Sequence, residues 1–422
     1  MTPLAWKNLS HNWVRTSVGV AGVGFAAMLI FMQMGFKGAI ESTATQVYDA
    51  LEFDLMIRSP AYLHLTEPRT FSRRRLRQAE SLPSVAAARP LLIALSEWQT
   101  PGKRGQDNSP DLAGAAWTLD QGPASTVTSG EAKPGLGRGI LVLGVNPADP
   151  PFAVERNDLA DASKKLTSSR FVLMDDKSKP EYGPQNDEEF GEDDLNVRTA
   201  LGPNRVVIKG VFTLGSGMVC NGACMVNDAG FQAAYPLQPP GEVNLGLVTL
   251  VDANADDADR NAAKLALEQL YDEPDDVEIL TRQQVVAHER DHWMQGTPFG
   301  VIFTLGVFVS ILVGVAIVYQ VLSTDIDNLL GEYATLKAMG YGNNYLSSVV
   351  LRQALLLALV SYVPSLLVAL GLYQAIRNAA GIPMELTFPI AAQVLALTIT
   401  MCLVSGAGAL RKLFTADPAS LF

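Results

Sequence analysis

Cysteine and histidine are scarce in this chain of 422 residues, which contains three cysteines and four histidines. Three cysteines are too few for the disulfide framework of a small secreted domain. Four histidines leave little material for a catalytic metal centre. Both kinds of scaffold are therefore set aside.

Charged residues are also few, at 18% of the chain, against about 25% in ordinary soluble domains. Hydrophobic residues reach 48% and the mean hydropathy is positive, at +0.16. The net charge of −11 argues against nucleic-acid binding through a broad basic surface. This composition indicates a membrane protein with a large part in water.

The acidic charge is concentrated in the middle of the chain. Residues 1–37 hold three bases and no acid, and residues 298–422 hold five of each, whereas the segment between them has 38 acidic and 24 basic residues. An acidic segment between apolar ends is typical of an aqueous domain placed between membrane segments.

Four apolar stretches have the length of about 20 residues that a membrane span needs. We expect spans at 18–36, 298–322, 345–373 and 388–410. A cleaved signal peptide is the alternative for the first stretch, but its long apolar run with bulky phenylalanines favours a retained anchor. Positive charge near the span ends, at Lys7, Arg15, Lys337, Arg411 and Lys412, predicts both termini on the cytoplasmic side.

This topology divides the remaining chain into five segments. It predicts a cytoplasmic N-terminal segment at 1–17, an external domain at 37–297, a cytoplasmic loop at 323–344, a short external loop at 374–387 and a cytoplasmic tail at 411–422.

The external domain shows two separated strand and helix units. One has a helix at 70–80 and a strand at 86–98, and the other has a strand at 245–251, a helix at 258–271 and a strand at 277–281. We expect two similar lobes from this pattern. Between them, short runs at 139–145, 170–174, 204–214 and 218–226 predict a mainly β insertion, with long loops at 102–136 and 183–199 and a helix continuing through 288–295.

Two small clusters in this domain have competing interpretations. Arg73, Arg74, Arg75 and Arg77 are suited to an anionic partner, but we favour a solvated helix face paired with carboxylates. Cys220 and Cys224 flank a three-residue connection and either form a small disulfide or remain two thiols.

A short helix is predicted in the cytoplasmic loop, within residues 323–342. Ser323, Thr324 or Asp325 can cap its start, and Gly340 can end it. Leu329, Tyr333 and Leu336, with Met339 or Gly340, line one face. The helix either lies in the lipid headgroups or docks into a groove of another protein. Docking is favoured because its polar side is not basic.

Residues 332–341, Glu-Tyr-Ala-Thr-Leu-Lys-Ala-Met-Gly-Tyr, resemble the coupling-helix motif of FtsX-like ABC permeases. Further resemblance, at 71–79, 144–152, 176–183 and 416–422, is to the DevC-like members of this MacB-like superfamily. The chain departs from their pattern around the two cysteines, at 218–225, and in the Gly/Pro-rich insertion at 102–136.

This resemblance implies a membrane α-helical fold with four transmembrane helices and a large α+β periplasmic domain of porter-like and β lobes, as in MacB-like (type VII) permeases. It implies a homodimer in the bacterial inner membrane that works with an ABC ATPase subunit, a periplasmic membrane-fusion adaptor and an outer-membrane channel. The implied ATPase-coupling residues are Glu332, Tyr333, Thr335, Leu336, Lys337, Met339 and Gly340.

The same resemblance implies mechanotransmission, in which ATPase-driven motion is passed to the periplasmic domain to export a lipid, glycolipid or other amphipathic envelope compound. The alternative in the family is a signalling permease that regulates an envelope enzyme. The chain has no Gly-x-x-x-x-Gly-Lys-Ser/Thr phosphate loop, so we expect no cofactor in this subunit and ATP on the partner.

One motif favours an enzyme instead. His288, Glu289 and His292 fit the H-E-x-x-H pattern of zinc peptidases, in which two histidines one helical turn apart bind the metal and the glutamate activates water. No clear third ligand follows, and glycine and proline interrupt the chain at 296–298. A helix leading to the second span explains the same residues, so we expect no catalytic residue and no metal site.

Overall fold

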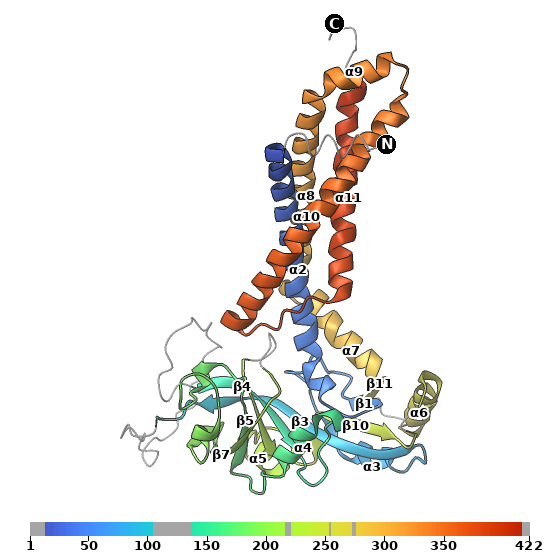
Figure 1. Ribbon diagram of the computed structural model, residues 1–422. Coiled ribbons are helices and arrows are strands. Elements are labelled where there is room, and N and C mark those ends of the chain that lie inside the picture. Colours follow the sequence, from blue (N-terminus) through green and yellow to red (C-terminus); the bar gives the residue numbers. More distant parts are fainter. Residues whose placement is uncertain (1–12, 104–136, 216–220, 253–254, 272–275, 416–422) are drawn as a thin grey trace. The chain divides into compact units, whose positions relative to one another are not determined.

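The computed structural model describes residues 13–103, 137–215, 221–252, 255–271 and 276–415. The chain divides into two compact units, one formed by Met1–Glu41 with Met294–Phe422 and the other by Ser42–Trp293. The first unit contains the long helices and the second contains the sheet (Figure 1).

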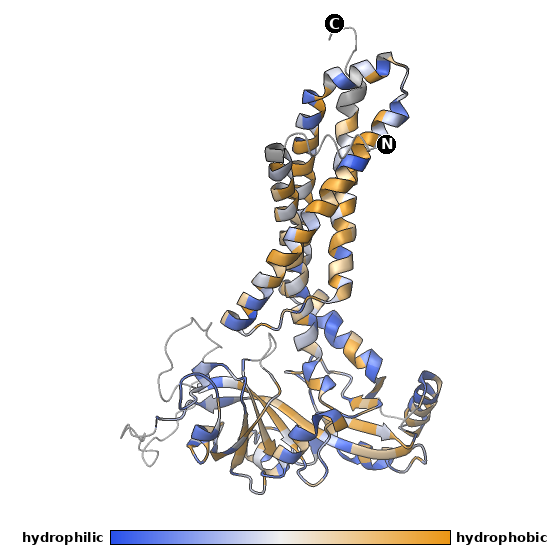
Figure 2. Ribbon diagram, viewed as in Figure 1, coloured by the Kyte–Doolittle hydropathy of each residue, from blue (hydrophilic) through white to orange (hydrophobic). Residues whose placement is uncertain are grey.

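Four helices of the first unit are long and apolar enough to cross a membrane. They are α2 (Trp13–Asp49), α8 (Pro298–Asn328), α10 (Asn343–Ala380) and α11 (Phe388–Thr415), and a short helix, α9 (Leu330–Ala338), joins α8 to α10. Hydrophobic residues dominate these long helices in Figure 2. The expectation of four transmembrane helices is confirmed, although the helices are longer than the apolar stretches because polar turns continue them at their ends.

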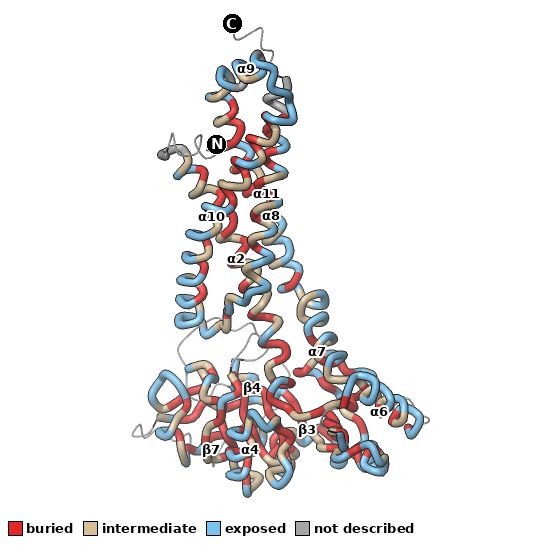
Figure 3. Tube along the Cα trace, turned by 45° about the vertical axis from the view of Figure 1, so that its right-hand side comes forward, coloured by how far each residue is buried: buried red, intermediate tan, exposed pale blue. Residues whose placement is uncertain are grey.

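One apolar cluster connects the four long helices of this unit. It includes Val23 on α2, Val318 on α8, Ala354 on α10 and Met401 on α11. Figure 3 shows many exposed positions along these helices. Leu305, Phe308 and Leu312 on α8 are among the exposed apolar residues. Exposed apolar side chains on a span face acyl chains rather than water, so this surface is consistent with a membrane environment.

The second unit is built on one sheet of nine strands in the order β11-β1-β10-β3-β4-β8-β5-β7-β6. Its strands are β1 (Leu55–Arg58), β3 (Val85–Gln99), β4 (Gly137–Val145), β5 (Phe171–Asp175), β6 (Arg198–Leu201), β7 (Asn204–Phe212), β8 (Ala223–Asn227), β10 (Leu245–Leu250) and β11 (Glu278–Thr281). Strands β2 (Phe71–Ser72) and β9 (Glu242–Val243) have two residues each and pair with each other in a separate two-stranded sheet.

Short helices accompany the sheet. They are α3 (Arg74–Ala79), α4 (Asn157–Ser163), α5 (Asp228–Ala234), α6 (Asp257–Leu270) and α7 (Arg282–Asp291), with 3₁₀ turns at Val154–Arg156, Pro180–Tyr182 and Glu192–Asp194 and a π-helical turn at His292–Gly296. The helix predicted to continue through 288–295 is therefore observed, as α-helix to Asp291 and as a π-helical turn from His292.

The prediction of two similar lobes is wrong in one respect. The two strand and helix units do not form one lobe each, because β1 pairs with both β10 and β11, which places them in one lobe with β3 as its last strand. The predicted β insertion forms the other lobe, from β4 to β6 in the sheet order. The two lobes thus divide at β3 in the order of the sheet.

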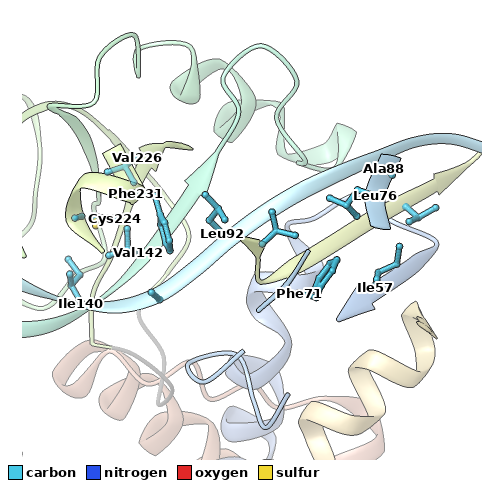
Figure 4. Close-up of a cluster of buried hydrophobic side chains, with 14 of the residues drawn as sticks. Ile57, Phe71, Leu76, Ala88, Leu92, Ile140, Val142, Cys224, Val226 and Phe231 are labelled. Carbon is cyan, nitrogen blue, oxygen red and sulfur yellow. The ribbon is translucent and has the colours of Figure 1, made fainter. Parts of the chain in front are cut away.

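Strand β3 belongs to both lobes. Its residues from Val85 to Leu91 pair with β10, and those from Leu92 to Gln99 pair with β4. The buried cluster in Figure 4 includes Ala88 and Leu92 of this strand, together with Ile57 of β1 and Phe231 of α5. The two lobes therefore share one continuous strand and one continuous apolar core.

Candidate functional site

The predicted helix in the loop between the second and third spans begins later than expected. Ser323, Thr324 and Asp325 do not cap it, because they belong to the last turns of α8. Leu322 and Ile326 are buried and continue the apolar face of α8 past the expected boundary. The helix therefore continues to Asn328.

The carboxylate of Asp325 accepts a hydrogen bond from another membrane helix. The Gln353 side-chain amide on α10 donates a hydrogen bond to it over 2.8 Å, and Gln353 is buried. The contact links the end of α8 to the beginning of α10, the two helices that α9 joins. The two helices that α9 joins are thus also connected by a side-chain hydrogen bond.

Helix α9 has nine residues and ends as the sequence predicts. Its first residue follows Leu329, which makes no side-chain cap. At the other end, the Gly340 N–H donates to the Lys337 carbonyl over 3.1 Å and Gly340 has a φ of 92°. Glycine adopts this left-handed conformation without steric cost, so Gly340 suits the position after the helix.

The expected coupling residues lie on different faces of α9. Leu336 packs, with Leu329, against the apolar cluster of its own membrane unit. Glu332, Thr335 and Met339, spaced three and four residues apart, are exposed, and Met339 has 62% of its surface accessible. Lys337 and Gly340 are also exposed, and the side chain of Tyr333 lies outside what the structure describes. The exposed face is therefore centred on Glu332, Thr335 and Met339.

A second polar site lies in the sheet unit, where α7 meets the end of α2. The Arg282 guanidinium donates hydrogen bonds to the carbonyls of Tyr48 and Leu51, both over 2.9 Å, and stacks on the Phe53 ring at 4.8 Å. The last carbonyls of a helix lack intrahelical donors and carry partial negative charge, so arginine stabilises this end. Arg282 thereby fastens the start of α7 to the end of α2.

Two turns further along α7, a buried carboxylate makes a second connection. Both the Tyr48 hydroxyl, at 3.0 Å, and the Tyr62 hydroxyl donate to Oε1 of Glu289, which is fully buried. Its other oxygen has no hydrogen-bond partner among the described residues. Burial, which penalises the charged form, raises the pKa of Glu289 and also that of Tyr62.

Sequence reasoning did not identify this cluster of Tyr48, Tyr62, Arg282 and Glu289. Glu289 drew attention only as part of the zinc-peptidase pattern, and the tyrosines are more than 220 residues away from it in the chain. The available local signal is the capping box Thr281–Gln284, which places Arg282 at the first turn of a helix. Nothing local indicates that this helix meets the end of the first span.

The zinc-peptidase interpretation finds no geometry to support it. Glu289 faces the two tyrosines, Nδ1 of His288 lies 3.5 Å from the Arg58 guanidinium, and His292 stacks on His64 with ring centroids 4.7 Å apart. Within the described ranges, no group of three or more histidine, cysteine, aspartate or glutamate residues is arranged to hold a metal ion. These residues instead pack the region between α7 and β1.

Two arginines of the cluster are paired within the domain, in agreement with the favoured interpretation. Arg73 forms an ion pair with Asp228 at 3.1 Å, and Arg75 forms one with Asp276 at 2.6 Å. The predicted disulfide cannot be assessed in the same way, because Cys220 lies outside the described residues, whereas Cys224 is buried in β8. That pairing stays a prediction.

Comparisons with known proteins give matches to parts of this chain. The sequence model of the family described as FtsX-like permease C-terminal matches residues 304–418. Among solved structures, the periplasmic region of MacB from Actinobacillus actinomycetemcomitans matches with a TM-score of 0.34 and 8% identity, over 57% of this chain and 93% of that one. No curated protein sequence matches the chain.

The family match covers most of α8, all of α9 and α10, and α11. FtsX-like permeases are transmembrane components that partner with a separate ATPase subunit. The resemblance to the DevC-like members in particular stays a prediction. Residues 304–418, which contain α9 and most of the last three membrane-length helices, are therefore similar to the C-terminal part of FtsX-like permeases.

Proposed function

We propose that this subunit transmits motion of a partner ATPase to its sheet-rich domain and thereby exports an amphipathic envelope compound. The ATPase contacts the exposed face of α9, and ATP is bound on that partner and not on this chain. A periplasmic membrane-fusion adaptor and an outer-membrane channel complete the path, and two copies of the permease work together.

The observation that carries the proposal is α9 itself. It is a nine-residue helix that joins two membrane-spanning helices and presents Glu332, Thr335 and Met339 to solvent, in a chain without a phosphate loop. Leu336 packs against the membrane core and the Asp325–Gln353 hydrogen bond joins the neighbouring helices, so a push on α9 moves α8 and α10.

Transmission to the sheet-rich domain requires firm connections at the ends of the spans. The continuous helix α2 carries Tyr48 at its last turn, and Arg282 and Glu289 hold that turn against α7, which precedes the second span in sequence. Within the sheet-rich unit, hydrogen-bonded groups therefore hold the end of α2 against α7.

The experiment tests the docking face with a substitution that leaves the membrane core intact. Met339→Asp places a carboxylate in the proposed apolar contact, and Asn344→Asp is the matched control at an exposed position on α10. Leu336 is unsuitable for this test because it packs against the subunit's own core. Co-purification of the ATPase in mild detergent and ATP hydrolysis are measured for both variants.

We expect Met339→Asp to lower recovery of the ATPase at least about tenfold, since burying an unpaired charge costs well over the 1.4 kcal/mol that corresponds to that factor. Asn344→Asp should bind as the unaltered chain does. Equal recovery of the ATPase with both variants would contradict docking through this face. ATP turnover without movement of any lipid or glycolipid would favour the signalling alternative.

A further inference from the structure

The strand that the two lobes share has an open stretch along one edge. On this edge β10 pairs with β3 only as far as Leu91, and β6 meets it again at Trp98. Strand β4 covers the opposite edge from Leu92 to Gln99. Among the described residues, no strand therefore pairs with the first edge between Ile93 and Glu97.

The hydrogen bonds at both ends of this gap show which backbone groups face it. In an antiparallel pair, every second residue directs its N–H and C=O to the same neighbour. The Ile93 N–H donates to the Asn244 side chain over 3.0 Å, on the open edge. The Glu97 C=O accepts from the Gly202 N–H over 2.7 Å, on the same edge. Leu95 lies midway between them and therefore directs its N–H and C=O into the gap.

The neighbouring strand leads independently to the same orientation. Leu141 stands opposite Leu95 on β4, and its N–H donates to the Gly222 carbonyl over 3.1 Å, on the side of β8. Leu95 and Leu141 are thus a non-hydrogen-bonded pair. Within the described residues, the N–H and the C=O of Leu95 have no hydrogen-bond partner.

The gap opens into a pocket of about 640 Å³. Segments 66–70 and 235–239 line this pocket beside residues 93–95. Two of its apolar side chains are accessible, since 46% of Leu95 and 84% of Leu237 is exposed. Proteins usually protect an open strand edge with charges, proline or a covering segment. Here an exposed leucine lies at its centre instead.

A buried amide forms the end of the gap. Asn244 is 3% exposed, and its Nδ2 donates to the Arg69 carbonyl over 3.0 Å while its Oδ1 accepts from Ile93. Arg69 has a φ of 55°, a left-handed conformation that is uncommon for residues other than glycine. Asn244 thus contacts β3 through its side chain and not through its backbone, which ends the β10 ladder at this point.

We propose that an extended segment of a partner protein binds here by adding a short strand to β3. Its backbone pairs with the N–H and C=O of Leu95, and its apolar side chains pack on Leu95 and Leu237. From Ile93 to Glu97 the edge spans about 13 Å, at about 3.3 Å per residue, which leaves room for three or four residues.

The free backbone groups select this occupant. A lipid tail has no group that hydrogen-bonds to the Leu95 N–H, and a helix uses its own backbone groups internally. The sheet edge of a second copy is kept away by segments 66–70 and 235–239, which stand beside the gap, whereas a single extended segment fits between them. Because the site lies in the sheet-rich domain, its occupation does not depend on ATPase docking at α9.

The first measurement is amide hydrogen exchange of the full chain in detergent, resolved to single residues by fragmentation in the mass spectrometer. We expect fast exchange at Leu95 between slow exchange at Ala94 and Ser96, whose N–H groups face β4. Slow exchange at Leu95 would show that the chain already covers its own edge, and it would overturn the proposal.

The binding test selects peptides on the immobilised full chain from a phage library of random dodecapeptides. The most enriched peptide is then synthesised with a fluorescent label, and its affinity is measured by polarisation. We expect Leu95→Asp and Leu237→Asp to weaken binding at least about tenfold. Leu237 is so exposed that its replacement leaves the fold intact. Leu265→Asp is the matched control, at an exposed position of α6 outside the pocket, and should bind as the unaltered chain does.

Backbone methylation of the same peptide separates strand addition from side-chain contact. Only every second N–H of an added strand faces β3, so N-methylation of one alternating set should abolish binding and methylation of the other set should not. The unmethylated peptide should also slow exchange at the Leu95 amide at least about tenfold.

Four results of these binding experiments would overturn the proposal. They are no enrichment of any peptide, binding that both aspartate variants leave unchanged, equal effects of the two methylated sets, and loss of self-association in Leu95→Asp, which would assign the edge to a second copy. None of these readouts involves the ATPase. A failure here therefore leaves docking at α9 untouched, and loss of docking in Met339→Asp would not alter peptide binding.

Discussion

Replacement of Tyr62 by phenylalanine should destabilise the sheet-rich domain by an amount that depends on pH. Its hydroxyl donates to the buried Glu289 carboxylate, and a hydrogen bond to a charged group contributes about 1.5–3 kcal/mol. For a folding unit of roughly 150–250 residues, each kcal/mol shifts the melting temperature by about 2–4 °C. We therefore expect Tyr62→Phe to melt about 3–12 °C lower at pH 7.5.

The pH dependence follows from the direction of the Glu289 pKa. Burial raises this pKa above 4.5, so the native state favours the protonated form. The corresponding stability is present in acid and is lost as pH rises through the raised pKa. The Tyr62 hydrogen bond opposes that rise, so its loss costs most where Glu289 is ionised. At pH 4.5 the deficit should shrink toward the roughly 0.5–1.5 kcal/mol of a neutral hydrogen bond.

The assay is thermal unfolding of the full chain in detergent, followed by tryptophan fluorescence at both pH values. Glu289→Gln is the control, because its amide oxygen still accepts from Tyr62 but does not ionise. In that background Tyr62→Phe should cost about 1 kcal/mol at either pH. Equal losses at both pH values in the otherwise unaltered chain would refute the argument that a charged carboxylate is involved.

Three further predictions use the same unfolding assay. Burial raises the pKa of Asp175 from 3.8 to about 6, so the protein should lose up to about 3 kcal/mol of stability as pH rises from 4 to 6. Asp175→Asn should remove this pH dependence of stability. A dependence that persists in the variant would contradict the prediction. Gly144→Val should destabilise by about 1–3 kcal/mol, because even a Cβ there lies 2.8 Å from Leu92 and 2.9 Å from Phe231, whereas the same change at the open Gly139 should cost less. Arg282→Gln should lose about 1–3 kcal/mol and increase hydrogen exchange at the end of α2, and unchanged exchange there would exclude the proposed fastening.

Much of the fold could be predicted from local patterns. Apolar length alone indicated the four membrane helices, and period-two runs indicated most strands of the sheet. The strand expected at 86–98 is observed as Val85–Gln99, and the helix expected at 258–271 as Asp257–Leu270. These elements are specified by short-range alternation and by turn residues, which a single sequence displays directly.

What sequence reasoning missed depends on contacts between distant residues. Strand β1, only four residues long, carries no period-two signal, yet it pairs with β10 and β11 and places both strand and helix units in one lobe. The start of α9 was misplaced because buried Leu322 and Ile326 extend α8 past three residues that suit a helix cap. In both cases tertiary packing outweighed local preference.

The strand shared by the two lobes also determines how the domain bears a load. Each lobe pairs with its own half of β3, so a force that separates the lobes along this strand is carried by the covalent backbone. Such a force acts on all the hydrogen bonds of one half in parallel, and it does not open them one after another from an end. The domain is therefore expected to move and to unfold as a single body, with slow hydrogen exchange on both sides of Leu91 and Leu92.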